Sequence, residues 1–212
     1  MIEFKTVKST AEGTIIEKKS KFIATILPIN SKKEAEAKIN ELKKKYDDAK
    51  HNCYAYSVLE DEMKITKSSD DGEPSGTAGI PILKVIMEEN LCNVLVVVTR
   101  YFGGILLGTG GLQRAYTDAT KRAIDNSNII KQQNGYEMNI IINYNDLNYI
   151  KYYLEKNNAL IQEIEYNENV NMIIDVTEKT KEEITNINSE IGNKIQKIET
   201  IYKKFIQKNA DI

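Results

Sequence analysis

The chain has 212 residues, of which 41% are hydrophobic, and a formal net charge of −2. These values exclude a disordered chain and a strongly basic nucleic-acid binder, and they allow one large core or two small ones. No apolar run approaches the roughly 20 residues that span a bilayer, and the N-terminus lacks the pattern of a signal peptide, so we expect a cytoplasmic protein with no membrane partner.

The first predicted elements are two strands followed by a helix. Residues 14–29 are rich in β-branched and apolar side chains on either side of a lysine cluster, which predicts a pair of strands. Ser31 and Glu34 have the spacing of a capping box and begin a helix. The apolar face of that helix comprises Ala35, Ile39, Leu42 and Tyr46.

A hairpin and an α/β segment follow. Residues 53–59 and 63–67 alternate as paired strands do, with Glu60, Asp61 and Glu62 as the turn. Pro81 suits the first turn of a second helix. The apolar face of this helix comprises Ile82, Val85, Ile86 and Met87. The continuous apolar run 93–98 predicts a central strand that is covered on both faces, and a third helix extends from Gly111 to about Asn126.

The remaining chain has a different order of elements. Residues 127–135 are polar and predict a linker. Asn145 is expected to cap one helix, and Thr180 and Glu183 to form the capping box of another. The apolar residues of the latter helix are Ile184, Ile187 and Ile191, and Gly192 ends it. Strands are predicted over 136–144, 159–166, 170–177 and 194–206. The order β-α-β-β-α-β is typical of a ferredoxin-like fold, so we expect an α+β protein with domains at 1–134 and 135–212.

The best candidates for a functional site lie in two glycine-rich segments, because eight of the eleven glycines fall between residues 72 and 111. In the first segment, 68–81, the acids Asp70, Asp71 and Glu73 allow three interpretations. The first is that they supply carboxylates to a magnesium site. The second is that they include a catalytic acid or base. The third is that their side chains cap turns. The sequence leaves all three open.

The second segment, 99–119, contains two of the three arginines of the chain, Arg100 and Arg114. A planar, permanently charged guanidinium suits a carboxylate or a phosphate. Either Arg100 pairs with an acid of the first segment, or Arg100 and Arg114 face an anion that is held by backbone N–H groups at the start of the third helix. In the second alternative the anion- or RNA-binding residues are Arg100, Gly103, Gly104, Gly108, Gly110, Gly111 and Arg114.

Other common site types are excluded. The spacing from Gly103 to Gly108 resembles a P-loop, but Thr109 and Gly110 follow where that loop needs Lys and Ser or Thr. His51 is the only histidine, which excludes a multi-histidine metal centre and leaves one candidate general base; a hydrogen-bonded structural role is the alternative. Cys53 and Cys92 lack metal-site spacing and are interpreted as reduced core thiols.

Long motifs in this region resemble those of the IMPACT/YigZ family in its two-domain bacterial form. They are KSKFIA at 19–24, HNCYAY at 51–56, SDDGEPSGTAG at 69–79 and VTRYFGGILLGTGGLQRAY at 98–116. One departure is Lys21, where an Arg is common in the family. The resemblance implies an N-terminal two-layer α/β sandwich similar to the second domain of a small-subunit ribosomal protein and to the fourth domain of the translocating elongation factor. It implies a ferredoxin-like tail similar to the fifth domain of that factor.

The resemblance also implies a role in translation, because both analogues contact ribosomal RNA and eukaryotic relatives regulate initiation. Our first hypothesis is a regulatory binding protein that engages structured RNA or the ribosome through the glycine-rich loops and arginines, without a cofactor. The alternative is a Mg-dependent enzyme that acts on a phosphorylated small substrate between the 68–81 and 99–111 loops. A third hypothesis is a regulator that binds a protein partner.

Overall fold

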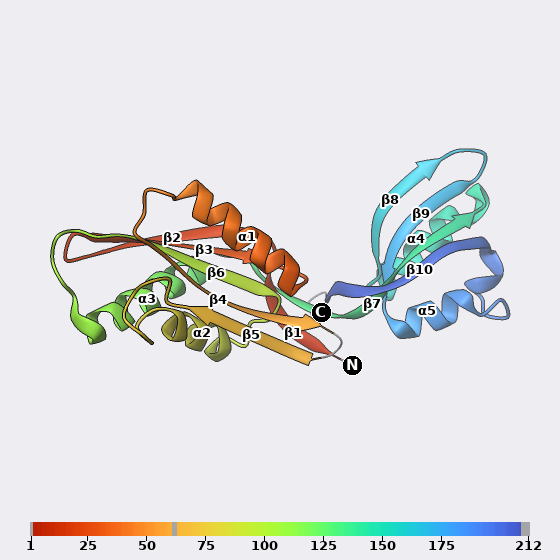
Figure 1. The fold of residues 1–212 in the computed structure, drawn as a ribbon. Helices are drawn as coiled ribbons and strands as arrows, with labels where there is room; N and C mark the ends of the chain where they lie inside the picture. The colour runs from red at the N-terminus through yellow and green to blue at the C-terminus, as the bar shows by residue number, and fades with distance from the viewer. Residues whose placement is uncertain (1, 61–62, 209–212) are drawn as a thin grey trace. The chain divides into compact units, whose positions relative to one another are not determined.

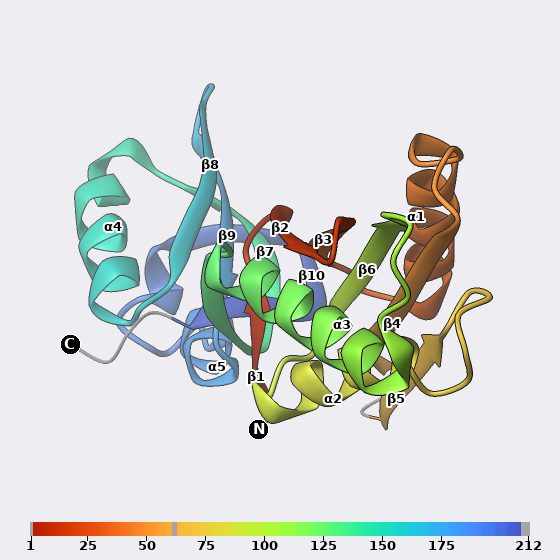
Figure 2. The ribbon, with the colours of Figure 1, turned by 90° about the vertical axis from the view of Figure 1, so that its left-hand side faces the viewer.

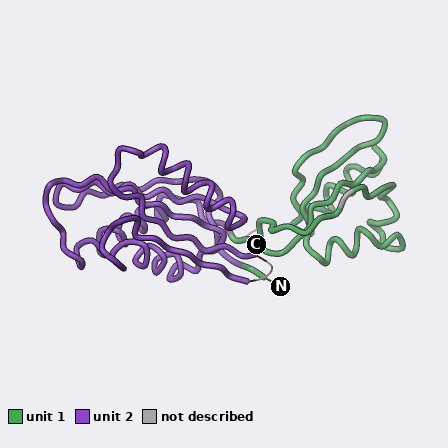
Figure 3. Tube along the Cα trace, viewed as in Figure 1, with its two compact units in different colours: residues 1–3, 131–212 green, residues 4–130 purple. Residues whose placement is uncertain are grey.

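The computed structural model describes residues 2–60 and 63–208. The chain forms two compact units, one of residues 4–130 and the other of residues 1–3 and 131–212 (Figure 3). The predicted boundary between residues 134 and 135 stays a prediction about where the domains divide. Among the described residues, no helix is both long enough and apolar enough to cross a membrane.

The first unit is built on an antiparallel sheet in the order β2-β3-β6-β4-β5. Its strands are β2 (Ala11–Glu17), β3 (Ser20–Pro28), β4 (His51–Glu60), β5 (Met63–Ser69) and β6 (Val94–Tyr101). Its helices are α1 (Lys32–Lys45), α2 (Gly79–Glu88) and α3 (Gly108–Asp125). The predicted strands, hairpin and central strand are confirmed; residues 61–62 of the predicted turn lie outside the described residues.

The central strand β6 is buried on both faces, as its unbroken apolar sequence predicts. Val94, Val96 and Val98 belong to a core that includes residues of α2 and α3. Leu95 and Val97 belong to a second core, with residues of α1. Helices α2 and α3 therefore form the helical layer of the sandwich, and α1 covers part of the other face (Figures 1 and 2).

The second unit has the ferredoxin-like order, which confirms the predicted α+β class. Its strands are β7 (Ile129–Ile142), β8 (Leu160–Tyr166), β9 (Val170–Val176) and β10 (Ile195–Lys208). Strand β7 pairs with β9 and β10, and β9 pairs with β8. Strand β1 (Glu3–Val7) belongs to the first unit from Phe4 onward. The helices are α4 (Leu147–Lys156) and α5 (Glu178–Thr185), with short 3-10 helices η1 (Tyr144–Asp146) and η2 (Gly192–Lys194).

The core of the second unit lies on one face of its sheet. Alternate residues of β7 and β9, such as Met138, Ile140 and Met172, pack with Ile150 of α4 and Ile184 of α5. This alternation is the period of two that the sequence displays in both strands.

The predicted linker, 127–135, contains the boundary between the two units at residues 130 and 131, but it is not irregular, because β7 begins at Ile129. Its polar residues 131–134 pair with β10 through backbone hydrogen bonds, which do not depend on apolar side chains. Tertiary pairing therefore decides the structure of a segment whose composition favours a loop.

Several predicted element ends also differ. Ser31 caps α1 by accepting the Glu34 N–H, as predicted, but the Glu34 side chain accepts from the N–H of Asn30 rather than that of Ser31. In the second unit, Asp146 precedes α4 in place of Asn145, and Thr177 caps α5 in place of Thr180. Each cap lies within a few residues of its predicted position, where local signals are weakest.

The predicted apolar faces of the helices are partly wrong. Helix α5 ends at Thr185, so Gly192 does not end it and Ile187 is 73% exposed. Met87 at the end of α2 is exposed too, whereas Ile82 and its neighbours on the predicted face are buried. Helix α3 begins at Gly108, three residues before the predicted start at Gly111, because glycine signals neither a helix nor a loop by itself.

Candidate functional site

The two glycine-rich segments meet at one end of the first sheet. There β4 and β3 begin and β6 ends, and Arg100 of β6 is paired with Phe22 of β3 on one side and with His51 of β4 on the other. Gly72, Glu73 and Pro74 of the first segment line one cavity together with residues 106–109 of the second. The two segments therefore face each other, as the pairing of Arg100 with an acid of the first segment requires.

A buried ion pair joins the two segments. Arg100 Nη1 lies 2.6 Å from Glu73 Oε1, and the side chains are only 7% and 3% exposed. The hydroxyl of Tyr116 on α3 donates to the same oxygen at 2.9 Å. Of the two alternatives for Arg100, the pairing with an acid of the first segment is thus the one in the structure. Removing one partner would leave a buried charge without compensation.

Cys53 extends this network without being reactive. Its Sγ lies 3.3 Å from the Tyr116 hydroxyl and 2.9 Å from the carbonyl oxygen of Asp70. Burial raises the pKa of the Cys53 thiol to about 12 and also raises the pKa of Tyr116. Both groups are therefore neutral donors at ordinary pH, as the interpretation of Cys53 as a core thiol requires.

Asp70 holds the first segment in shape. Its carboxylate accepts backbone N–H bonds from Gly76, Ala78 and Gly79 at 2.8, 3.0 and 2.8 Å. Burial acts to raise the pKa of Asp70, but these bonds outweigh it and hold the pKa below its ordinary value. Because Ala78 precedes α2 without a side-chain cap, Asp70 replaces the cap from a distant position.

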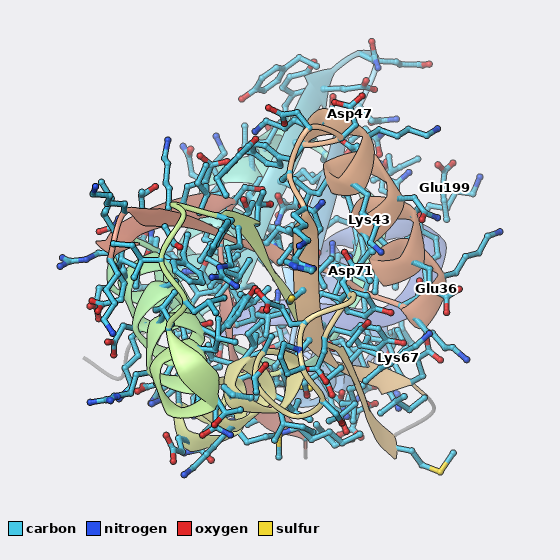
Figure 4. All side chains as sticks on the ribbon, turned by 60° about the vertical axis from the view of Figure 1, so that its left-hand side comes forward. Glu36, Lys43, Asp47, Lys67, Asp71 and Glu199 are labelled. Carbon is cyan, nitrogen blue, oxygen red and sulfur yellow. The ribbon has the colours of Figure 1, made fainter. Side chains whose placement is uncertain are left out.

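Asp71 connects the segment to α1 and β4. Its carboxylate accepts from Lys43 Nζ and, at 2.7 Å, from the N–H of Asn52; Figure 4 shows Lys43 beside it. Its carbonyl oxygen lies 2.9 Å from His51 Nδ1. A carbonyl can only accept, so the geometry assigns the hydrogen to Nδ1 and makes Nε2 of the neutral ring an acceptor.

These contacts bear on the magnesium and catalytic interpretations of the acids. Asp70, Asp71 and Glu73 each bind a different set of protein donors, so they do not converge as ligands of one ion. Within residues 2–60 and 63–208, no group of three or more His, Cys, Asp and Glu side chains is placed to hold a metal. The donor set does not fit a magnesium ion, and the turn-capping interpretation describes Asp70 and Asp71 best.

The second segment packs against the β2–β3 turn. A Cβ on Gly103 would lie 2.0 Å from the carbonyl carbon of Lys19, so only glycine fits there. The Gly103 N–H donates to Ser20 Oγ at 3.1 Å. Gly104 and Gly108 have φ of +85° and +71°, which disfavour other residues.

Arg100 and Arg114 line different cavities, so the structure does not bring the two predicted arginines together. Arg114 is exposed, and its Nε contacts the carbonyl oxygen of Gly110 within α3. It lines a second cavity, of about 280 Å³, with Gly111, Glu17 and Lys18, among others. The reason is helical geometry, because Gly108 and Thr109 lie toward the cavity of Arg100 whereas Gly111 and Arg114 lie toward the other.

We call the first cavity the loop-end cavity. Its volume is about 430 Å³, and Arg100, Glu73 and His51 are the buried polar residues of its lining. Its other lining residues are Lys50, Gly72, Pro74, Phe102, Leu106, Leu107, Gly108, Thr109 and Leu112. Sequence reasoning missed Lys50 in this lining and missed the hydrogen bond from Tyr116 to Glu73. The only signal for that bond was a hydroxyl on a buried helical face, which requires a partner.

The fold and this site define a two-unit α+β protein whose glycine-rich loops are fixed by a buried ion pair. Comparison with known proteins agrees with this description. The model of the Impact N-terminal domain matches residues 18–124, and that of a domain of unknown function, DUF1949, matches residues 140–186.

Full-length relatives extend the match to most of the chain. IMPACT family member YvyE of Bacillus subtilis is 38% identical over 188 residues, covering 89% of this chain and 86% of the relative. An IMPACT family member of Haemophilus influenzae is 32% identical and covers 86% of this chain and 89% of the relative. A solved structure described as a hypothetical protein has a TM-score of 0.64 at 25% identity, with complete coverage of both chains. The chain belongs to the IMPACT family.

Proposed function

We propose that this protein is a translation-associated regulator that engages structured RNA or the ribosome through the end of the first sheet. Membership of the IMPACT family supports a role in translation, because the resemblance of its motifs implies that role. Fold alone does not fix function, so the choice of RNA as the partner depends on the chemistry of this surface.

The observation that carries the proposal is the β2–β3 turn. Its two central residues, Lys18 and Lys19, have φ of +44° and +66°. A two-residue hairpin turn of this kind prefers Asn and Gly, because a Cβ makes the left-handed region unfavourable. Both lysines are exposed. Strained residues at an exposed tip favour a functional explanation, and two ammonium groups suit phosphate.

Further cations lie at the same end of the sheet. Lys21 is exposed on β3 directly after the turn, Lys50 precedes β4, and Arg114 shares its cavity with Lys18. Glu17 and Asp118 line that cavity too, so the surface is a local cluster rather than a uniform basic face. This suits contacts to a few phosphates of a folded RNA and agrees with the net charge of −2.

The test is association with ribosomes and with a structured ribosomal RNA fragment at several salt concentrations. We expect binding to weaken with salt, and Arg114→Ala or the double change of Lys18 and Lys19 to reduce the salt slope by about 0.7–0.9 per lost phosphate contact. Lys33→Gln is the matched control, because Lys33 is an exposed lysine of α1 that follows the opposite end of β3. A protein that stays at the top of the gradient at low salt would refute the proposal.

The enzymatic alternative receives less support from the site, because the three acids on which it depends are engaged in structural contacts. A protein partner is an outcome of the same experiment. Association with ribosomes that persists after the RNA fragment fails to bind would indicate a ribosomal protein as the contact.

A further inference from the structure

The loop-end cavity is not needed for RNA contacts at the β2–β3 turn, and it has features of its own. Its volume of about 430 Å³ lies within the range of small-molecule sites. We propose that it binds a nucleoside monophosphate unit, meaning a planar base joined through a sugar to one phosphate. The proposal goes beyond the proposed function, since a regulator can bind RNA at its surface without such a cavity.

One side of the cavity suits the phosphate. Helix α3 has 18 residues and begins without a side-chain cap, and Gly108 and Thr109 of its first turn line the cavity. The first N–H groups of a helix lack partners within the helix and carry a partial positive charge. Lys50 lines the same cavity and is exposed. The only acid in the lining, Glu73, is already paired with Arg100.

A buried polar side chain of the lining points independently to a ligand. His51 is 9% exposed and lines the cavity. Because its Nδ1 donates to the carbonyl oxygen of Asp71, the Nε2 of the neutral ring is left as an acceptor for a hydroxyl or amino group. A ligand that carries such a donor would satisfy this side chain.

Another part of the lining suits a planar ring. Phe102 is 48% exposed and lines the cavity. The guanidinium carbon of Arg100 lies 5.6 Å from the centroid of the Phe102 ring and 5.4 Å from that of Phe22. A base that stacks on the Phe102 ring would gain about 1–3 kcal/mol. Leu106, Leu107 and Leu112 complete an apolar wall.

The experiment is calorimetric titration of the full chain with AMP, GMP, CMP and UMP. Adenosine and inorganic phosphate serve as probes that carry only one half of the ligand. We expect at least one nucleotide to bind at a single site and to bind about tenfold or more tightly than either half, which corresponds to about 1.4 kcal/mol. No saturation by any nucleotide below about 1 mM, or equal binding of adenosine and AMP, would overturn the proposal.

Variants locate the binding. Phe102→Leu keeps an apolar wall but removes the stacking ring, so we expect about tenfold weaker binding. Lys50→Gln is expected to weaken the binding of nucleotides more than the binding of adenosine, because adenosine has no phosphate. The matched controls are Ile105→Ala, an exposed apolar residue of the same loop outside the lining, and Lys33→Gln on α1. A control variant that weakens binding as much as Phe102→Leu would place the nucleotide elsewhere and overturn the assignment.

A last arm distinguishes a free nucleotide from an unpaired residue of an RNA chain. If the bound nucleotide displaces a short single-stranded RNA, the cavity takes a residue of RNA; if the RNA remains bound, the natural ligand is the free nucleotide. The proposed function is tested separately, because it depends on Lys18 and Lys19 of the β2–β3 turn. A protein that binds AMP but no ribosomal RNA would retain the cavity proposal alone.

Discussion

The strained turn between β2 and β3 allows stability and binding to be separated. We consider the double variant Lys18→Asn, Lys19→Gly, which places at φ of +44° and +66° the residues that such turns prefer. A left-handed residue with a Cβ costs about 1–2 kcal/mol. The greater chain entropy of an unfolded glycine offsets about 0.5–1 kcal/mol of this gain. We expect the free energy of unfolding to rise by about 1 kcal/mol.

The same change removes two ammonium groups from the surface that we propose contacts RNA. Stability is measured by urea unfolding, and association with a structured ribosomal RNA fragment is measured between about 50 and 200 mM salt, the range over which phosphate contacts weaken steeply. Lys19→Gly alone is the matched control, because it relieves strain at one position and keeps Lys18. We expect its RNA affinity to lie between those of the native chain and the double variant.

Two results would refute the reasoning. A double variant that is less stable than the native chain would mean that the turn is not strained by its lysines. A double variant that is more stable and binds RNA as well as the native chain would mean that the lysines are not retained for phosphate.

Three further predictions concern the framework of the site. Arg100→Leu leaves Glu73 buried without its partner, so urea unfolding should reveal a loss of about 3–5 kcal/mol, and a loss under about 1 kcal/mol would contradict the ion pair. The folded pKa of Asp70 lies below its unfolded value, so its contribution to the free energy of unfolding is present above about pH 4 and is lost as the pH falls through the folded pKa. Asp70→Asn should therefore make stability depend less on pH in the acid range. An unchanged pH dependence would contradict this role of Asp70. The added methyl group of Gly103→Ala would overlap the backbone of Lys19. Gly104→Ala has open space around its methyl group but a φ of +85°, so it should lower the free energy of unfolding by about 1 kcal/mol, and Gly103→Ala should lower it clearly more. Equal thermal stabilities of the two variants would contradict the close packing.

Elements with a local cause could be predicted from the sequence. The Ser31 cap, the β4–β5 hairpin and the buried central strand β6 follow from side-chain chemistry and periodicity within a few residues. The long motifs around the two glycine-rich segments were enough to indicate the IMPACT family. That the segments face each other was a hypothesis that followed from the charge of Arg100 and the acids of the first segment.

Elements that depend on a distant partner could not be predicted. The polar residues 131–134 form a strand because β10 pairs with them, although that strand is more than 60 residues away in sequence. The sequence allowed Arg100 to form an ion pair with any of the three acids in 70–73. The tertiary structure pairs it with Glu73, which is buried and accepts a hydrogen bond from Tyr116. Composition cannot rank such partners, because their distances depend on how the sheet and α3 pack.

The sequence by itself therefore determined the class of fold, the family and the two segments that build the site. Only the tertiary structure decided that Asp70 and Asp71 serve the loop, that Arg100 and Arg114 line different cavities, and that Lys18 and Lys19 adopt left-handed backbone conformations. The physical reason is that periodicity and capping act between neighbours in the chain, whereas ion pairs, cavities and turn strain arise where strands and helices far apart in sequence come into contact.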